Sequence, residues 1–167
     1  MHDDILRIAS AGSLSVLRNM LFDCGRLMPG EAILIVEEPA GAGYYEDGLA
    51  DIVAQGAQAL GLTVARRVEP VVETAQPPSQ ALALAMREAS LTLFLARRGD
   101  QLRFHGLHPA FRGIVCYALE ARTLFSPFGA APYAAMVALR DRIDDVFWAA
   151  SQVRLTCKRG SDLVGAI

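Results

Sequence analysis

The chain has 167 residues, of which 53% are hydrophobic and 20% are charged. This length fits one ordinary domain, and the apolar content is too high for a disordered chain. The formal net charge of −2 gives no electrostatic reason to expect a nucleic acid or an anionic membrane as partner, and no apolar run is long enough to span a membrane.

The N-terminus and the cysteines both indicate a reducing compartment. The first residues, Met1 to Asp4, are acidic and lack the basic and then apolar order of a secretory signal peptide. The cysteines, which are Cys24, Cys116 and Cys157, are odd in number and widely spaced, so they do not indicate a disulfide framework. We therefore expect a cytoplasmic protein.

Helices and strands alternate along the predicted chain. Apolar residues at helical spacing predict helices over 13–24 (with Ser13 as a cap), 49–60, 81–86 and from Pro132 to Phe147. Short apolar or alternating runs predict strands over 32–36, 62–68, 91–95, 113–119, 152–157 and 162–167. Gly99 and Asp100 predict a turn after the third of these strands.

This order predicts an α/β fold with a Rossmann-like, mostly parallel sheet and helices on both faces. The last two strands instead predict a partial β-hairpin, whose return arm, 162–167, is apolar and would expose a strand edge if it stayed uncovered. We therefore expect an α/β accessory domain over residues 1–152. Residues 153–167 would be the start of a hairpin leading to a C-terminal domain that is absent from the chain.

The loop after the first predicted strand contains Gly41, Gly43 and Gly48. Glycine-rich loops can cradle a phosphate with their backbone N–H groups. Here the third glycine lies too late for the dinucleotide fingerprint, and Glu46 and Asp47 would repel a pyrophosphate. We interpret this segment as an ordinary loop beside a ligand cleft.

Three residues are candidates for ligand binding: Glu38, His105 and Arg112. Glu38 follows Glu37 at the end of the first predicted strand, and neighbouring strand residues point to opposite faces, so only one of the two can line a cleft. His105 and Arg112 are expected at the carboxyl edge of the sheet, where α/β proteins place their ligands.

No catalytic residue, metal site or cofactor is expected within this chain. His105 and His108 could share a metal ion if they lay on a helix, but Gly106 and Pro109 oppose a helix there. There is no Gly-x-Ser-x-Gly motif, and two of the cysteines lie inside apolar strand patterns, where a thiol is usually inert.

Fifteen of the sixteen basic residues are arginine, and Lys158 is the only lysine. Guanidinium groups suit the recognition of phosphate and carboxylate groups. The arginines are scattered along the chain, however, which favours the codon preference of a GC-rich genome as their explanation.

Three stretches resemble the N-terminal domain of the thermophilic-type (M29) leucyl aminopeptidase family and its relatives, which include the 2,5-dihydroxypyridine dioxygenases. They are 29–36, 51–64 and 153–163, and the last is similar to the family's hairpin V-x-V-T-x-x-x-G-T-D-L. Ser161 stands where the family usually has threonine, and Glu37 and Glu38 replace a single aspartate. The resemblance places the metal-binding residues in a C-terminal domain, so none is carried onto this chain.

The resemblance implies an accessory domain that shapes the cleft of an aminopeptidase-like, metal-dependent enzyme, either a hydrolase or a ring-cleaving dioxygenase. A divalent metal is then expected only in the absent domain, and a small-molecule or peptide substrate is met only through the full-length protein. This chain alone would be inactive and would form a homo-oligomer. Two alternatives remain open: a stand-alone small-molecule binding module that uses the glycine-rich loop, and an oligomerisation module built on the helix 133–147.

Overall fold

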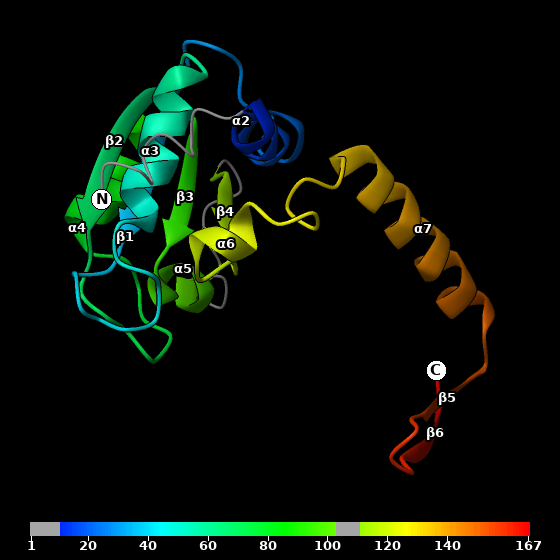
Figure 1. Cartoon of the computed structure of the whole chain (residues 1–167). Coiled ribbons are helices and arrows are strands. Elements are labelled where there is room, and N and C mark those ends of the chain that lie inside the picture. Colours follow the sequence, from blue (N-terminus) through cyan, green and yellow to red (C-terminus); the bar gives the residue numbers. More distant parts are fainter. Residues whose placement is uncertain (1–10, 103–110) are drawn as a thin grey trace. The chain divides into compact units, whose positions relative to one another are not determined.

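The computed structural model describes residues 11–102 and 111–167 (Figure 1). The chain divides into two compact units, Met1–Ala131 and Pro132–Ile167. The boundary predicted from the sequence lies after residue 152, whereas the structure groups the long helix with the hairpin.

The first unit contains a four-stranded parallel sheet in the order β2-β1-β3-β4 (Figure 1). Its strands are β1 (Ala32–Glu37), β2 (Thr63–Val68), β3 (Leu91–Leu95) and β4 (Gly113–Val115). The first three match the predicted strands closely, but β4 is shorter than the predicted 113–119. Its partner β3 ends at Leu95, which lies opposite Cys116 in this register, so residues 117–119 have no residue of β3 to pair with.

Helices cover both faces of the sheet, which confirms the predicted α/β architecture. They are α2 (Ala11–Arg18), the π-helix η1 (Asn19–Cys24), α3 (Leu49–Ala59), α4 (Gln80–Glu88), α5 (Arg97–Leu102) and α6 (Ala121–Leu124). Alternate residues of β1 point to opposite faces. Ile33 and Ile35 therefore pack in one core cluster, with residues of α2, η1, α3 and α6. Leu34 and Val36 pack in the other cluster, with residues of α4 and α5.

Two local predictions were wrong. The first helix begins at Ala11, so Ser13 lies inside it rather than at its cap. Gly99 and Asp100, predicted as a turn, lie inside α5. The reason for the glycine is close packing, because a Cβ atom at Gly99 would lie 2.4 Å from the Cβ atom of the buried Phe94. Ser79 caps α4 and accepts a hydrogen bond from the N–H of Leu82 at 3.1 Å.

The order of the strands defines a switch point in the topology. From β1 the chain passes through α3 to β2 on one side, and then through α4 to β3 on the other side of β1. In open parallel sheets, ligands bind outside the carboxyl ends of the strands at such a point. Here that point lies between the carboxyl ends of β1 and β3.

The second unit consists of the helix α7 (Tyr133–Ala149) and an antiparallel hairpin of β5 (Gln152–Thr156) and β6 (Asp162–Ala166). The hairpin is therefore confirmed, and it is paired along the whole length of both strands. No residue of α7 is buried by the rest of the second unit, so the hairpin does not cover its predicted apolar stripe. Within the described segments, no helix has both the length and the apolar character needed to cross a membrane.

Candidate functional site

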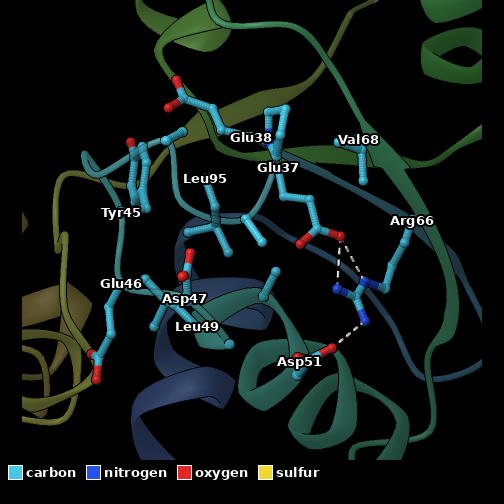
Figure 2. Close-up of a pocket in the computed structure, with 15 residues that line it drawn as sticks. Glu37, Glu38, Tyr45, Glu46, Asp47, Leu49, Asp51, Arg66, Val68 and Leu95 are labelled. Carbon is cyan, nitrogen blue, oxygen red and sulfur yellow. Dashed lines mark hydrogen bonds and ion pairs between the residues drawn. The ribbon is translucent and has the colours of Figure 1, made fainter.

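A pocket of about 460 Å³ lies between the carboxyl ends of the central strands and the loop 38–48 (Figure 2). This volume lies within the range of roughly 300–1,000 Å³ that is typical of small-molecule sites. The acidic residues that line it are Glu37, Glu38, Glu46, Asp47 and Asp51, and Arg66 is the basic residue among its described lining. The pocket is therefore predominantly negative.

Arg66 links three elements on one wall of this pocket. Its Nε and Nη2 atoms donate hydrogen bonds to Glu37 Oε1 at 2.9 and 2.7 Å, and its Nη1 atom donates to Asp51 in the first turn of α3 (Figure 2). Partial burial opposes the charge on Arg66, but the hydrogen bonds to Asp51 and Glu37 outweigh it and raise the pKa of Arg66. The guanidinium thus ties β2 to β1 and to α3.

Glu38 is held by Arg97 at the switch point. Its carboxylate accepts hydrogen bonds from the Arg97 backbone N–H at 2.8 Å, from Nε at 2.9 Å and from Nη2 at 2.8 Å. Burial alone would raise the pKa of Glu38, but the hydrogen bonds and the charge of Arg97 outweigh it and hold that pKa below its ordinary value. The side chains of Glu37 and Glu38 point apart, as expected for neighbours on a strand (Figure 2). Both nevertheless line the pocket, so the prediction that only one of them could line a cleft was wrong. A role of Glu38 in ligand binding remains a prediction.

The acidic side chains of the glycine-rich loop are used to fold it. The backbone N–H of Gly41 donates to the Asp47 carboxylate at 3.0 Å, and the N–H of Ala121, at the start of α6, donates to Glu46 at 2.7 Å. In a phosphate-binding loop, backbone N–H groups of this kind are free to bind the ligand. Here the Gly41 N–H group is already bound to Asp47. This arrangement supports the interpretation of an ordinary loop beside a cleft.

Tyr45 fixes the same loop to the chain that follows β4. Its hydroxyl group donates a hydrogen bond to the backbone carbonyl of Cys116 at 2.8 Å. Burial is the main reason why the pKa of Tyr45 is raised, with smaller contributions from Cys116 and other nearby groups. The hydroxyl group therefore stays protonated and acts as a structural donor.

Replacing Tyr45 with phenylalanine should lower the free energy of unfolding by about 1 kcal/mol, because the Cys116 carbonyl loses its partner in a half-buried place. Tyr44→Phe is the matched control, since Tyr44 is exposed and its ring contact with Arg97 survives the change. Urea denaturation of both variants measures the difference. Equal effects of the two substitutions would contradict the assigned role of the Tyr45 hydroxyl group.

Of the predicted ligand-binding residues, Glu38 and Arg112 are described, and they lie at opposite edges of the sheet. Arg112 directly precedes β4, and its carbonyl accepts from the N–H of Thr92 near the start of β3. It therefore lies at the amino edge of the sheet, opposite to the edge that was predicted. Its Nη2 atom donates to the carbonyls of Gly25 and Arg26, the latter at 2.8 Å, which anchors the end of η1. His105 lies outside the described residues.

The predicted absence of a metal site rests on the sequence and is not tested by the fold. Within 11–102 and 111–167, no three His, Cys, Asp or Glu side chains are grouped so that they could hold a metal ion. The thiol of Cys116 is buried, which raises its pKa, and it donates a weak hydrogen bond to the carbonyl of Ala118.

The fold and the site together define an α/β domain with a small pocket at the carboxyl edge of a parallel sheet. Neither protein-family models nor curated proteins match the sequence. Among solved structures, the chain is similar to a 2,5-dihydroxypyridine dioxygenase from Pseudomonas putida KT2440, with 12% identity and a TM-score of 0.50. The match covers 95% of this chain and 48% of that chain, so this chain spans about half the length of the dioxygenase. At this identity the likeness shows the fold alone.

Proposed function

We propose that this chain is an accessory, cleft-shaping domain of a metal-dependent enzyme in the aminopeptidase-like group that includes the 2,5-dihydroxypyridine dioxygenases. The metal and the catalytic residues belong, in this proposal, to a partner domain. Two findings support it: the hairpin 153–163 is similar to the family's hairpin, and the likeness to the dioxygenase extends over almost all of this chain but about half of that one.

The observation that carries the proposal is the apolar surface that the second unit leaves uncovered by its own residues. Its exposed large apolar side chains are Met136, Leu139, Ile143, Val146, Phe147, Trp148, Leu155, Leu163, Val164 and Ile167, and Trp148 is 84% exposed. A single helix and a two-stranded hairpin cannot stabilise themselves without burying such groups. The second unit therefore requires a protein surface outside itself to pack against, and a larger enzyme would provide such a surface to an accessory domain.

The pocket at the carboxyl edge fits the cleft-shaping part of the proposal. Glu38, Glu46 and Asp47 are held by internal hydrogen bonds, so the wall is preformed rather than mobile. Its negative character suits a substrate that presents a positively charged or hydrogen-bond-donating group on this side. The substrate in this proposal is a small molecule or a peptide, and the protein acts in the cytoplasm.

The proposal is tested on the purified chain by its metal content and its activity. We expect no stoichiometric zinc, manganese or iron after incubation with each ion, no hydrolysis of leucine p-nitroanilide, and no oxygen uptake with 2,5-dihydroxypyridine. The reason is that the proposed catalytic centre lies in the partner domain. One equivalent of bound metal together with turnover of either substrate would overturn the proposal.

The size of the pocket also favours a second candidate, a stand-alone module that binds a small molecule. Light scattering separates this from the accessory role, which includes homo-oligomer formation through the uncovered surface. A strictly monomeric chain that is stabilised by a metabolite, and that loses this stabilisation in Asp51→Asn, favours the module. A chain that self-associates, and whose stability no metabolite changes, favours the accessory domain.

A further inference from the structure

Two consecutive arginines follow β3 at the switch point, and they differ in whether their charge is paired. Arg97 pairs with Glu38, which follows the neighbouring strand β1. The charge of Arg97 is thereby balanced inside the protein. Arg98 is the next residue, in the first turn of α5.

Two of the three guanidinium nitrogens of Arg98 are buried without a hydrogen-bond partner. The residue is only 7% exposed, and among the residues that the structure describes, its fully buried Nε and Nη1 atoms find no acceptor. None of the ion pairs and cation–π contacts found over the described stretches of the chain involves it. A guanidinium group stays charged at any physiological pH, so Arg98 carries a buried and uncompensated positive charge.

Such an arrangement is unfavourable in a folded protein, since buried charges are almost always paired or hydrogen-bonded. The acidic side chain nearest in sequence, Asp100, accepts a hydrogen bond from the hydroxyl group of Tyr117 at 2.6 Å. The sequence 103–110, which follows α5, contains no aspartate or glutamate. Apart from Asp100, the neighbouring sequence therefore offers Arg98 no carboxylate.

We propose that Arg98 anchors an oxyanion-binding site, which takes the carboxylate or phosphate group of a small-molecule ligand at the switch point. Guanidinium groups form strong charge-assisted hydrogen bonds with both kinds of group. The position agrees with the general rule for open parallel sheets, in which ligands bind where the strand order reverses. Arg98 does not line the pocket of Figure 2, whose acidic wall would repel an anion. The proposal goes beyond the accessory role and holds whether or not that role is correct.

The test is thermal unfolding of the whole chain in chloride, inorganic phosphate and succinate at equal pH and ionic strength. We expect phosphate or succinate to raise the melting temperature of the wild-type chain, because a ligand that binds the folded state stabilises it. Because phosphate also stabilises proteins by exclusion from their surface, the anion with the larger shift that depends on Arg98 identifies the class of ligand. Arg98→Met should abolish this shift, and Arg98→Lys should weaken anion binding by roughly tenfold, since it keeps the charge but loses the planar donor set.

The control is Arg122→Met, because the Arg122 side chain is 84% exposed and pairs with Glu120 at the surface. This variant should keep the full anion shift. In chloride, Arg98→Met should be at least as stable as the wild-type chain, because it removes an unpaired buried charge. The proposal is overturned if neither anion shifts the wild-type chain, or if the shift persists in Arg98→Met. If Arg98→Met does not fold, an unchanged anion affinity in Arg98→Lys overturns it.

Discussion

Replacing Arg97 with alanine should lower the free energy of unfolding at neutral pH by about 3 kcal/mol, near the lower end of the range for breaking a buried ion pair. The Glu38 side chain is only 3% exposed, and the substitution leaves its carboxylate without the side-chain donors of Arg97. We expect a value near the lower end because the Arg97 side chain is 23% exposed. Water near its guanidinium group weakens the electrostatic attraction between Arg97 and Glu38. Urea denaturation of the variant and the wild-type chain gives the difference.

The pH dependence of this loss identifies Glu38 as its source. In the wild-type chain the pKa of Glu38 lies below its ordinary value of 4.5, so the pair contributes stability above that pH and loses it as the pH falls through the lowered pKa. Without Arg97, burial remains as the main influence and raises the pKa of Glu38 instead. The deficit of Arg97→Ala should therefore be largest near neutral pH, should begin to shrink as the pH falls through the raised pKa of Glu38 in the variant, and should be lost below the lowered pKa of Glu38 in the wild-type chain.

Arg122→Ala is the control for a salt bridge at the surface. Its pair with Glu120 is exposed, so we expect a loss of about 0.5 kcal/mol or less. If Arg97→Ala cost no more than this control, or if its deficit did not change between neutral and acidic pH, then the pair at the switch point would not stabilise the fold as described.

Phe94→Ala should cost about 3–5 kcal/mol, the range for removing a large aromatic side chain from a core. Phe94 lies on the central strand β3, is 2% exposed, and packs with Leu34 and Val36 on the face that α4 and α5 cover. Its Cβ atom also supports the close approach of Gly99 in α5. Phe128→Ala, at a position that is 76% exposed, should change the stability by about 0.5 kcal/mol or less. Similar losses in the two variants would contradict the assignment of Phe94 to the core.

The central strands could be predicted from the sequence because both of their faces are buried. The apolar runs 32–36 and 91–95 are continuous, which is typical of strands covered on two sides. The helix α5 could not be predicted in the same way. Gly99 and Asp100 favour a turn locally, and it is the packing of Gly99 against Phe94 that makes a glycine suitable inside the helix.

The candidate site was predictable only in part. Glu38 follows an evident strand, but its pairing with Arg97 joins residues far apart in the sequence, and no local pattern reports it. The position of Arg112 could have been predicted correctly, because it directly precedes the predicted strand 113–119 and so belongs to the amino edge. The apolar spacing of α7 predicted a helix, but spacing alone does not tell whether another surface covers it.

The two edges of the sheet affect whether copies of the chain aggregate at high concentration. The strand β2 pairs with β1 on one side and is the last strand of the sheet on the other. Its centre carries Arg66 and Arg67, and charged side chains on an edge strand discourage the addition of a strand from another molecule. At the opposite edge, β4 is only three residues long and offers little backbone for such an addition. Fibrillar aggregation by sheet extension is therefore disfavoured at both ends of this sheet.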